Sequence, residues 1–205
     1  MQTQDTAAIK GWKIRDFITL AIFNVVLLII YAVVCMLDTL WASAGSYLFG
    51  QGIFALFSGP VYMVMANKIS KRGVLFFSGV VWGLLFTAGG YYYYLIVLLF
   101  VGVLCELVMW GKDTYRSMIR NGFGYGLFNI GVNLCGTIPL IFFGEQYRAT
   151  LTKSYSPEQL DLVLYYYGTP AMVIITCAIT LVGALAGCRI GNRLLKKHVK
   201  KAKLV

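Results

Sequence analysis

The sequence predicts an all-α membrane protein, a compact bundle of six transmembrane helices with both termini cytoplasmic. Composition is the first reason: 59% of the 205 residues are hydrophobic and only 13% are charged, whereas a soluble domain keeps about a quarter of its residues charged. The second is a series of apolar stretches close to the roughly 20 residues of a spanning helix. The third is the distribution of cations. No linker or soluble segment is long enough to make a second domain, so residues 1–205 are expected to form a single domain.

Six segments are predicted as spans from their length and apolar character. The first follows basic residues, but its apolar core exceeds the roughly 7–15 residues of a cleaved secretory signal, so we interpret it as a retained helix. The third is the shortest and ends at Gly89-Gly90. The predicted boundaries are about 16–37, 46–67, 74–90, 92–110, 122–143 and 169–190.

Lysine and arginine fall almost entirely on one side of this topology. With both termini cytoplasmic, 16 of 18 lie in the N-terminus, the 67–73 and 111–121 loops, and the C-terminal segment that ends in the basic tail 191–205. Only Arg148 and Lys153 remain outside, an asymmetry that the positive-inside rule predicts. The net charge of +10 therefore reflects orientation and attraction to anionic lipid, and it requires no nucleic-acid partner.

The outer side is predicted to hold a long loop and most of the tyrosines. Within the loop, 144–168, Ser156-Pro157-Glu158 is a typical helix start, so we expect a partly helical lid, with a solvated linker as the alternative. An interfacial tyrosine belt normally marks both faces of the membrane, so an aromatic-lined outer pocket is a rival explanation. The ten tyrosines concerned, of fourteen, are Tyr47, Tyr91, Tyr92, Tyr93, Tyr94, Tyr147, Tyr155, Tyr165, Tyr166 and Tyr167.

Small and amide residues recur at helical spacing on the last two spans. Gly183, Gly187 and Gly191 share one face of the last span, which allows close approach of another helix, either within the bundle or from a second membrane subunit. Asn129 and Asn133 stand one turn apart on the fifth span and either bridge helices or bind a solute.

Motifs for catalysis or metal binding are missing from the sequence. The one histidine, His198, lies in the basic tail, and there is no HExxH, no pair of intramembrane carboxylates and no GK[ST] loop. The five cysteines lack CxxC spacing and are typical of isolated small hydrophobes. We therefore expect no enzymatic activity, and transport driven by ATP would need the ATPase of another protein.

Two segments resemble the Trep-Strep group of substrate-binding (S) components of energy-coupling factor (ECF) importers. SGPVYMVMANKISKRGVLFFSGVVWGLLFTAGG (58–90) is similar to the group's second-to-third helix segment, and GALAGCRIGNRLLKKHVKKAKLV (183–205) to its last helix and basic end. The resemblance implies a subunit in the plasma membrane of a prokaryote that captures a small molecule outside. The resemblance also implies that this subunit then topples within the bilayer while it is docked on an ECF transmembrane coupling subunit, which two ATPase subunits drive.

The resemblance also implies a docking face on the first helix, where S components often carry Ala-x-x-x-Ala. Here the two positions hold Ala21 and Val25. Glu106, a costly carboxylate in a predicted span, either snorkels toward Lys112 or pairs with the coupling subunit. The predicted docking residues are Ala21, Val25, Glu106, Gly183, Gly187 and Gly191.

Haem is the leading substrate, because some systems of this type have been associated with haem acquisition. Nickel and cobalt are disfavoured, since the N-terminal histidines of those S components are missing here. With no histidine in the spans, the axial ligand must be Cys, Met or Tyr, and Cys105 is the candidate for haem iron, although it lies about 20 Å inward from Tyr92. A vitamin or other small organic nutrient is the alternative, as is a non-transporting scaffold or regulatory subunit. The predicted substrate-binding residues are Cys105, Tyr91, Tyr92, Tyr94, Asn129, Asn133, Arg148 and Met172.

Overall fold

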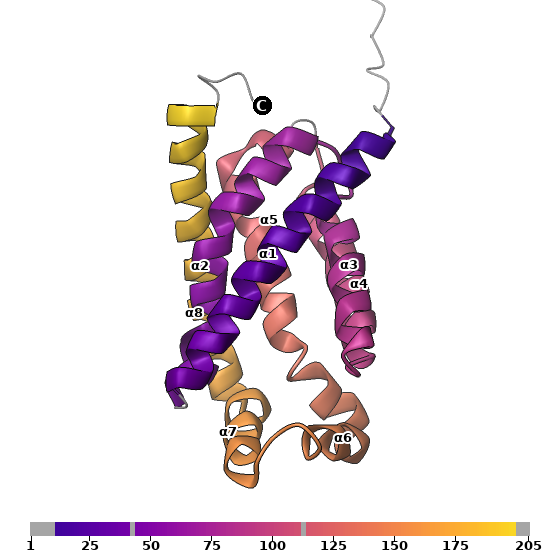
Figure 1. Ribbon diagram of the computed structural model, residues 1–205, viewed down its shortest axis with the longest axis vertical. Helices are drawn as coiled ribbons and strands as arrows, with labels where there is room; N and C mark the ends of the chain where they lie inside the picture. Colours follow the sequence, from indigo (N-terminus) through magenta and orange to yellow (C-terminus); the bar gives the residue numbers. More distant parts are fainter. Residues whose placement is uncertain (1–10, 42–43, 112–113, 200–205) are drawn as a thin grey trace, which may run out of the picture.

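The computed structural model describes residues 11–41, 44–111 and 114–199, and every regular element within these ranges is helical (Figure 1). The predicted all-α class is therefore confirmed. The elements are α1 (Ile14–Trp41), α2 (Ala44–Ile69), α3 (Val74–Ala88), α4 (Tyr93–Val108), η1 (Thr114–Arg116), α5 (Met118–Leu134), α6 (Ile138–Leu151), α7 (Pro157–Gly168), α8 (Pro170–Leu194) and the π-helical turn η2 (Leu195–Val199).

Four stretches are long and apolar enough to cross a membrane: Ile14–Leu37, Gly45–Ile69, Met118–Leu151 and Pro170–Lys197. The two remaining apolar helices, α3 and α4, have only 15 and 16 residues. At 1.5 Å per residue they reach about 23 Å, less than the roughly 30 Å hydrocarbon core of a bilayer. All six predicted segments are thus helical, but two are shorter than a perpendicular crossing requires.

The fifth predicted span, 122–143, was expected to be one helix and is two. The α5 helix ends at Leu134, and α6 begins at Ile138 with Pro139 in its first turn. Proline has no N–H to donate to the preceding turn, so it starts a new helix there instead of continuing α5. A second break falls within α6 at Gly144, whose φ of 31° and ψ of −103° are non-helical. The predicted lid, 144–168, therefore begins inside α6.

Segment 144–168, which we continue to call the lid, is largely helical. The α7 helix begins at Pro157 after Ser156, whose side chain accepts a hydrogen bond from the backbone N–H of Gln159 in a capping box. Figure 1 shows α6 and α7 closing one end of the bundle, while α1 starts and α8 ends at the other. The described ends of the chain therefore lie at the same end of the bundle.

Cations gather at the end that holds both described ends of the chain. Arg193 stands in the last turn of α8, which ends there, whereas Arg148 stands on α6 and Lys153 in the turn before α7, the two helices of the other end (Figure 1). Arg72 and Arg116 stand in the connections between α2 and α3 and between α4 and α5. Lys10, Lys112 and tail residues 200–205 lie outside the described residues. The helices thus separate the cations into the two groups that the sequence predicts.

The closest contact in the bundle joins α2 to α8, through glycines on both helices. A Cβ added to Gly187 would lie 2.5 Å from the carbonyl oxygen of Leu56, and one added to Gly59 would lie 2.6 Å from the backbone of Gly187. Gly183 and Gly191 meet the backbone of Gly52 and Pro60 in the same way. These glycines therefore pack within the bundle instead of forming an open docking face.

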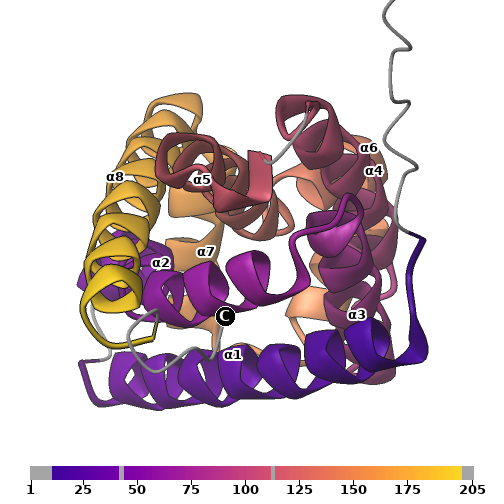
Figure 2. The ribbon, with the colours of Figure 1, turned by 90° about the horizontal axis from the view of Figure 1, so that it is seen from above.

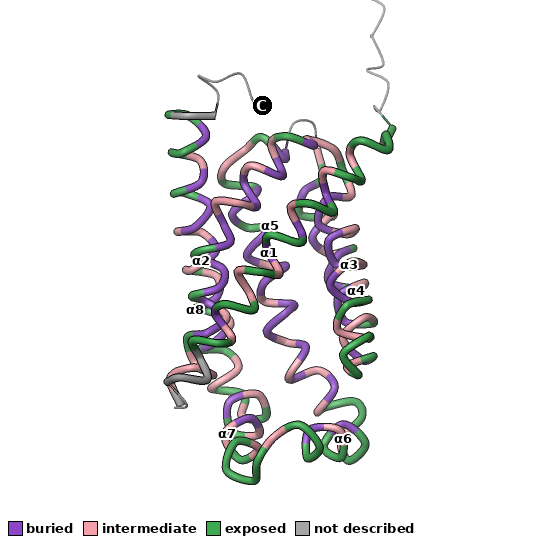
Figure 3. The backbone as a smooth tube through the Cα atoms, in the orientation of Figure 1, coloured by how far each residue is buried: buried purple, intermediate pink, exposed green. Residues whose placement is uncertain are grey.

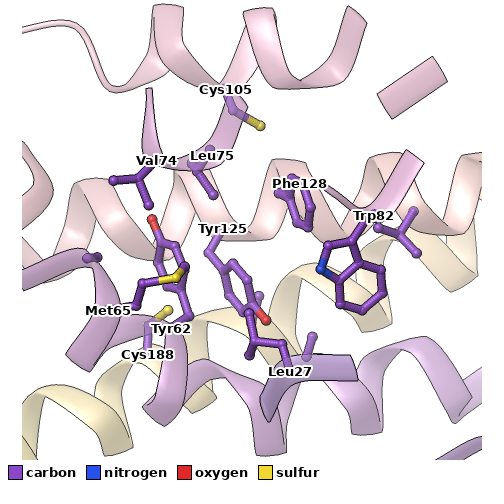
Figure 4. Packing of buried hydrophobic residues seen from close by; sticks show 14 of the residues in the cluster. Leu27, Tyr62, Met65, Val74, Leu75, Trp82, Cys105, Tyr125, Phe128 and Cys188 are labelled. Carbon is purple, nitrogen blue, oxygen red and sulfur yellow. The ribbon is translucent and has the colours of Figure 1, made fainter. Parts of the chain in front are cut away.

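The interior of the bundle combines aromatic rings with hydrogen-bonded polar groups. Buried residues face inward on every long helix, whereas α1 exposes its outer side (Figure 3) and lies along one side of the bundle (Figure 2). The Asn24 amide of α1 donates to Ser78 Oγ at 3.1 Å and accepts from Trp82 Nε1 at 3.0 Å. Tyr62 and Tyr125 stack at 4.1 Å between centroids (Figure 4). These contacts join α1 to α3 and α2 to α5.

Replacing Gly187 by alanine is expected to destabilise the protein by about 1–3 kcal/mol, the usual cost of overpacking a tight contact. The added methyl must separate α2 from α8, since the atoms it meets are backbone carbonyls that cannot move aside. Thermal unfolding in mild detergent measures the loss. Gly168→Ala is the matched control, because nothing lies within 4 Å of the position that its methyl group would take; equal losses in both variants would contradict the close-contact explanation.

Candidate functional site

The candidate site is a cavity at the α6–α7 end of the bundle, enclosed by α1, α2 and the lid. Its volume is about 280 Å³, and it adjoins a smaller cavity of about 110 Å³ that reaches α4 and α5. Both are lined by Tyr31, Gln51, Tyr155 and Tyr167. We call the two together the outer cavity, because they share these walls.

Six of the twenty described residues that line the outer cavity are tyrosines. Tyr94 and Tyr147, from α4 and α6, meet through their hydroxyls at 2.8 Å. Tyr31 of α1 sets its edge against Phe54 and Trp82 at 5.3 and 5.4 Å between centroids. Because aromatic rings from several helices line the cavity, it offers aromatic surface for contact with a planar molecule.

Gln51 lines both parts of the outer cavity, and its hydrogen bonds show which of its side-chain atoms is left for a ligand. The Asn129 amide nitrogen donates to the backbone oxygen of Tyr125 at 2.8 Å, so its Oδ1 is the acceptor left for Gln51. The Gln51 amide nitrogen donates to that Oδ1 at 3.2 Å. Gln51 Oε1 is therefore the atom of this side chain left for a ligand.

The orientation of the Asn133 side-chain amide is also set by its hydrogen bonds, and it leaves one acceptor atom unpaired. The Thr176 hydroxyl donates to the Val173 carbonyl at 3.0 Å, so its oxygen accepts from Asn133 Nδ2 at 2.9 Å. Since Nδ2 faces Thr176, the remaining amide atom of Asn133 is Oδ1. This buried oxygen has no hydrogen-bond partner among the described residues. An unpaired buried acceptor costs about 1–3 kcal/mol, which a donor group on a bound molecule would recover.

None of the described residues that line the outer cavity has a charged side chain. Tyr155, in the turn between α6 and α7, contributes a hydroxyl that stays protonated, since burial raises its pKa to about 12. The cavity therefore offers aromatic faces, hydroxyl groups and two amide oxygens, and it matches an uncharged, planar, hydrogen-bonding molecule better than an ion.

The structure brings some of the predicted substrate residues together and separates others. Tyr94 and Asn133 line the outer cavity. Asn129 does not line it, but its side chain accepts a hydrogen bond that orients Gln51. Tyr91 stacks on Tyr94 at 5.2 Å between ring centroids. Tyr92 is exposed and donates its hydroxyl to Tyr93. Arg148 lines a different groove, and Met172 lines none of the described cavities.

Cys105 lies away from the outer cavity. It is fully buried on α4, beside Val74 and Leu75 of α3 (Figure 4), and it lines none of the described cavities. No group of three His, Cys, Asp or Glu residues in the described part of the chain could hold a metal ion. The structure therefore places this thiol in the packed core and not with the other predicted substrate residues.

Glu106 caps the start of α3 from the neighbouring helix α4. Its Oε2 accepts from the backbone N–H of Gly73 at 2.8 Å, and its Oε1 accepts from that of Leu75 at 3.1 Å and from the Tyr115 hydroxyl. The α3 helix has no side-chain cap of its own at Gly73. The carboxylate thus satisfies free donors and faces the positive end of the helix dipole, which is a structural role.

Tyr115 completes this cap from the η1 turn. Burial, reinforced by the adjacent Glu106 carboxylate, raises the pKa of the Tyr115 hydroxyl well above its ordinary value. The hydroxyl therefore remains a donor to the carboxylate. Lys112, the predicted snorkelling partner of Glu106, lies outside the described residues.

Tyr31 and Gln51 are among the lining residues that the sequence prediction missed. Tyr31 lies within the first predicted span, where an aromatic ring among apolar residues gives no signal, since Phe17 and Phe23 occur there too. Gln51 is the uncharged polar residue of Gly50-Gln51-Gly52, between two glycines in a predicted span. A lone amide at such a position is costly in lipid and normally faces the bundle interior, so that pattern could have identified it.

The model of a family described as hypothetical bacterial integral membrane protein (Trep_Strep) matches residues 14–201. No curated protein and no solved structure matches the chain.

Replacing Glu106 by alanine is expected to lower stability by about 1–2 kcal/mol, the scale of losing a helix cap with a favourable charge. Thermal unfolding in detergent gives the difference, and Glu106→Gln should fall between wild type and Glu106→Ala because one acceptor oxygen remains. Glu145→Gln, which removes an exposed carboxylate on α6, should leave the unfolding temperature unchanged. If Glu145→Gln lowered the unfolding temperature as much as Glu106→Gln does, the capping role of Glu106 would be contradicted.

Proposed function

The chain belongs to the Trep_Strep family of bacterial integral membrane proteins, and we propose that it is the substrate-binding component of an ECF-type importer. One observation carries the proposal: a lidded cavity, lined partly by tyrosines and with an unpaired amide oxygen, lies at the end of the bundle opposite the cations. Under the positive-inside rule the cation-rich end is cytoplasmic, so the cavity faces the exterior, where an importer captures its substrate.

The proposed topology has six crossings with both termini in the cytoplasm. The separation of cations and the shared end of α1 and α8 support it. The short helices α3 and α4 pack against each other as a hairpin beside the long helices. Local thinning of the bilayer accommodates spans of this length.

The substrate that the outer cavity fits best is a small, uncharged, planar organic nutrient with at least two hydrogen-bond donors. Aromatic side chains along the cavity favour contact with a planar ring. The orphaned Asn133 oxygen and the Gln51 oxygen favour donors such as ring N–H or hydroxyl groups. A site built to hydrogen-bond a substrate rejects analogues that lack those groups, because its own polar atoms are then left unpaired.

Haem is less well supported than such a nutrient. Its proposed axial ligand, Cys105, is fully buried in the core and lines none of the described cavities. The larger part of the outer cavity, at about 280 Å³, is also at the small end of the range for ligand pockets.

Transport requires partners, because the chain has no nucleotide-binding motif. We propose an ECF transmembrane coupling subunit with two ATPase subunits, docked on the outer side of α1. Val25 is 55% exposed and Ala21 is exposed on that side, so the small side chain of Ala21 is open to close helix contact.

Tagged protein purified from its native membrane in mild detergent should carry a second membrane protein and two ATPases. Ala21→Trp should reduce their recovery, since a bulky side chain blocks close approach at α1. Val103→Trp adds the same bulk on α4, whose Val103 is also exposed, and should leave recovery unchanged. Purification of the wild-type chain alone would refute the importer assignment and favour a scaffold.

Small molecules retained by the purified protein, released by denaturation and measured by mass spectrometry, test the substrate site. Asn133→Leu should lower the retained nutrient about tenfold or more, as expected for the loss of a buried hydrogen-bond acceptor. Cys105→Ala should leave the retained amount unchanged. A Soret band in wild type after addition of hemin, absent from Cys105→Ala, would instead assign haem as the substrate.

A further inference from the structure

A second hollow of the molecule, which we call the lateral groove, lies between α6, α7 and α8. It measures about 520 Å³ and shares only Tyr167 with the outer cavity. Its walls are mainly apolar, and the side chains that argue for a ligand are Thr137, Ile141, Arg148 and Ile174. The groove is therefore a separate site that the proposed import function does not use.

The apolar wall of the lateral groove opens toward the surroundings of the bundle. Ile141 of α6 and Ile174 of α8 are 71% and 68% exposed. In a membrane such side chains face acyl chains. A ligand in the groove therefore meets hydrocarbon along this wall.

The polar end of the groove favours an anion. Arg148 is the one charged side chain among the described residues that line it, and its guanidinium has no ion-pair or hydrogen-bond partner among the described residues. Helix α8 also starts at the groove, with Thr169 as N-cap making no side-chain cap bond and Pro170 in its first turn. The free backbone N–H groups and the positive end of the helix dipole attract negative charge at this point.

A buried, unpaired hydroxyl gives a further and independent indication of a ligand. Thr137 lines the groove and is only 7% exposed, yet its Oγ1 has no hydrogen-bond partner among the described residues. A buried hydroxyl normally finds a partner. The groove thus offers a cation, a helix N-terminus and a spare hydroxyl beside a lipid-facing apolar wall.

We propose that the lateral groove binds one anionic phospholipid of the outer leaflet. The headgroup phosphate lies against Arg148 and the start of α8, and one acyl chain runs along Ile141 and Ile174. The Thr137 hydroxyl hydrogen-bonds an oxygen of the headgroup or ester region. Because α6 and α7 form the lid of the outer cavity, the bound lipid joins the lid to α8.

The test uses the full chain in phosphatidylcholine nanodiscs and in detergent, with phosphatidylglycerol or phosphatidylcholine added. Native mass spectrometry should detect one retained phosphatidylglycerol, and this lipid should raise the unfolding temperature where phosphatidylcholine does not. Arg148→Gln should weaken the apparent affinity for phosphatidylglycerol about fivefold, the effect of one basic side chain near anionic lipid. Thr137→Val, combined with Arg148→Gln, should weaken the affinity for phosphatidylglycerol further.

Lys153→Gln is the matched control, because it removes the other described cation of this end from a position outside the groove. It should leave phosphatidylglycerol binding unchanged. Equal stabilisation by the two lipids, or an equal loss in Lys153→Gln, would overturn the proposal. Equal stabilisation by inorganic phosphate alone would overturn it too, since the ligand would then be a soluble anion.

Discussion

Close backbone contact between α2 and α8 is the constraint on which the rest of the structure depends. Lipid is as apolar as leucine, so helices in a membrane associate through close packing and polar contacts and not through the hydrophobic effect. Glycines at four-residue spacing on α8 bring it against the backbone of α2. Asn133 of α5 donates to Thr176 of α8, and Gln51 of α2 donates to Asn129 of α5. The orientation of both amides in the outer cavity therefore depends on how the α2–α8 pair packs against α5.

Polar groups are treated differently at the two ends of the bundle. Toward the cation-rich end they are paired: Tyr62 donates to Asn121, and Glu106 caps α3. The buried side-chain atoms left unpaired among the described residues, Asn133 Oδ1 and Thr137 Oγ1, belong to residues that line the outer cavity and the lateral groove. A saturated network stabilises one packing arrangement, whereas unpaired buried groups favour a bound molecule. The unpaired buried groups of the described residues thus belong to the part of the bundle where the two hollows lie.

The lid links the two proposed ligands. Tyr147 and Tyr155 close the outer cavity from the α6–α7 side, while Arg148, next to Tyr147 in sequence, faces the lateral groove. Successive residues of a helix point about 100° apart, so α6 can serve both sites at once. A kink at Gly144, with its non-helical φ and ψ, turns this part of α6 across the end of the bundle. The nutrient and the lipid would then both act on the position of the same segment.

The sequence by itself determined the helical class, the six apolar segments, the one-sided cations and the start of α7, because these follow from composition and from local spacing. It also singled out Tyr94 and Asn133, which line the outer cavity. The break between α5 and α6 also had a local signal in the sequence, Pro139, which the prediction of a single span passed over. Only the tertiary structure decided that Tyr31 and Gln51 line the cavity and that Arg148 does not. It also placed Cys105 in the core and made Glu106 a cap for a helix about thirty residues earlier in the chain. These features depend on which helix faces meet, and periodicity reveals that a face exists but not which neighbour covers it.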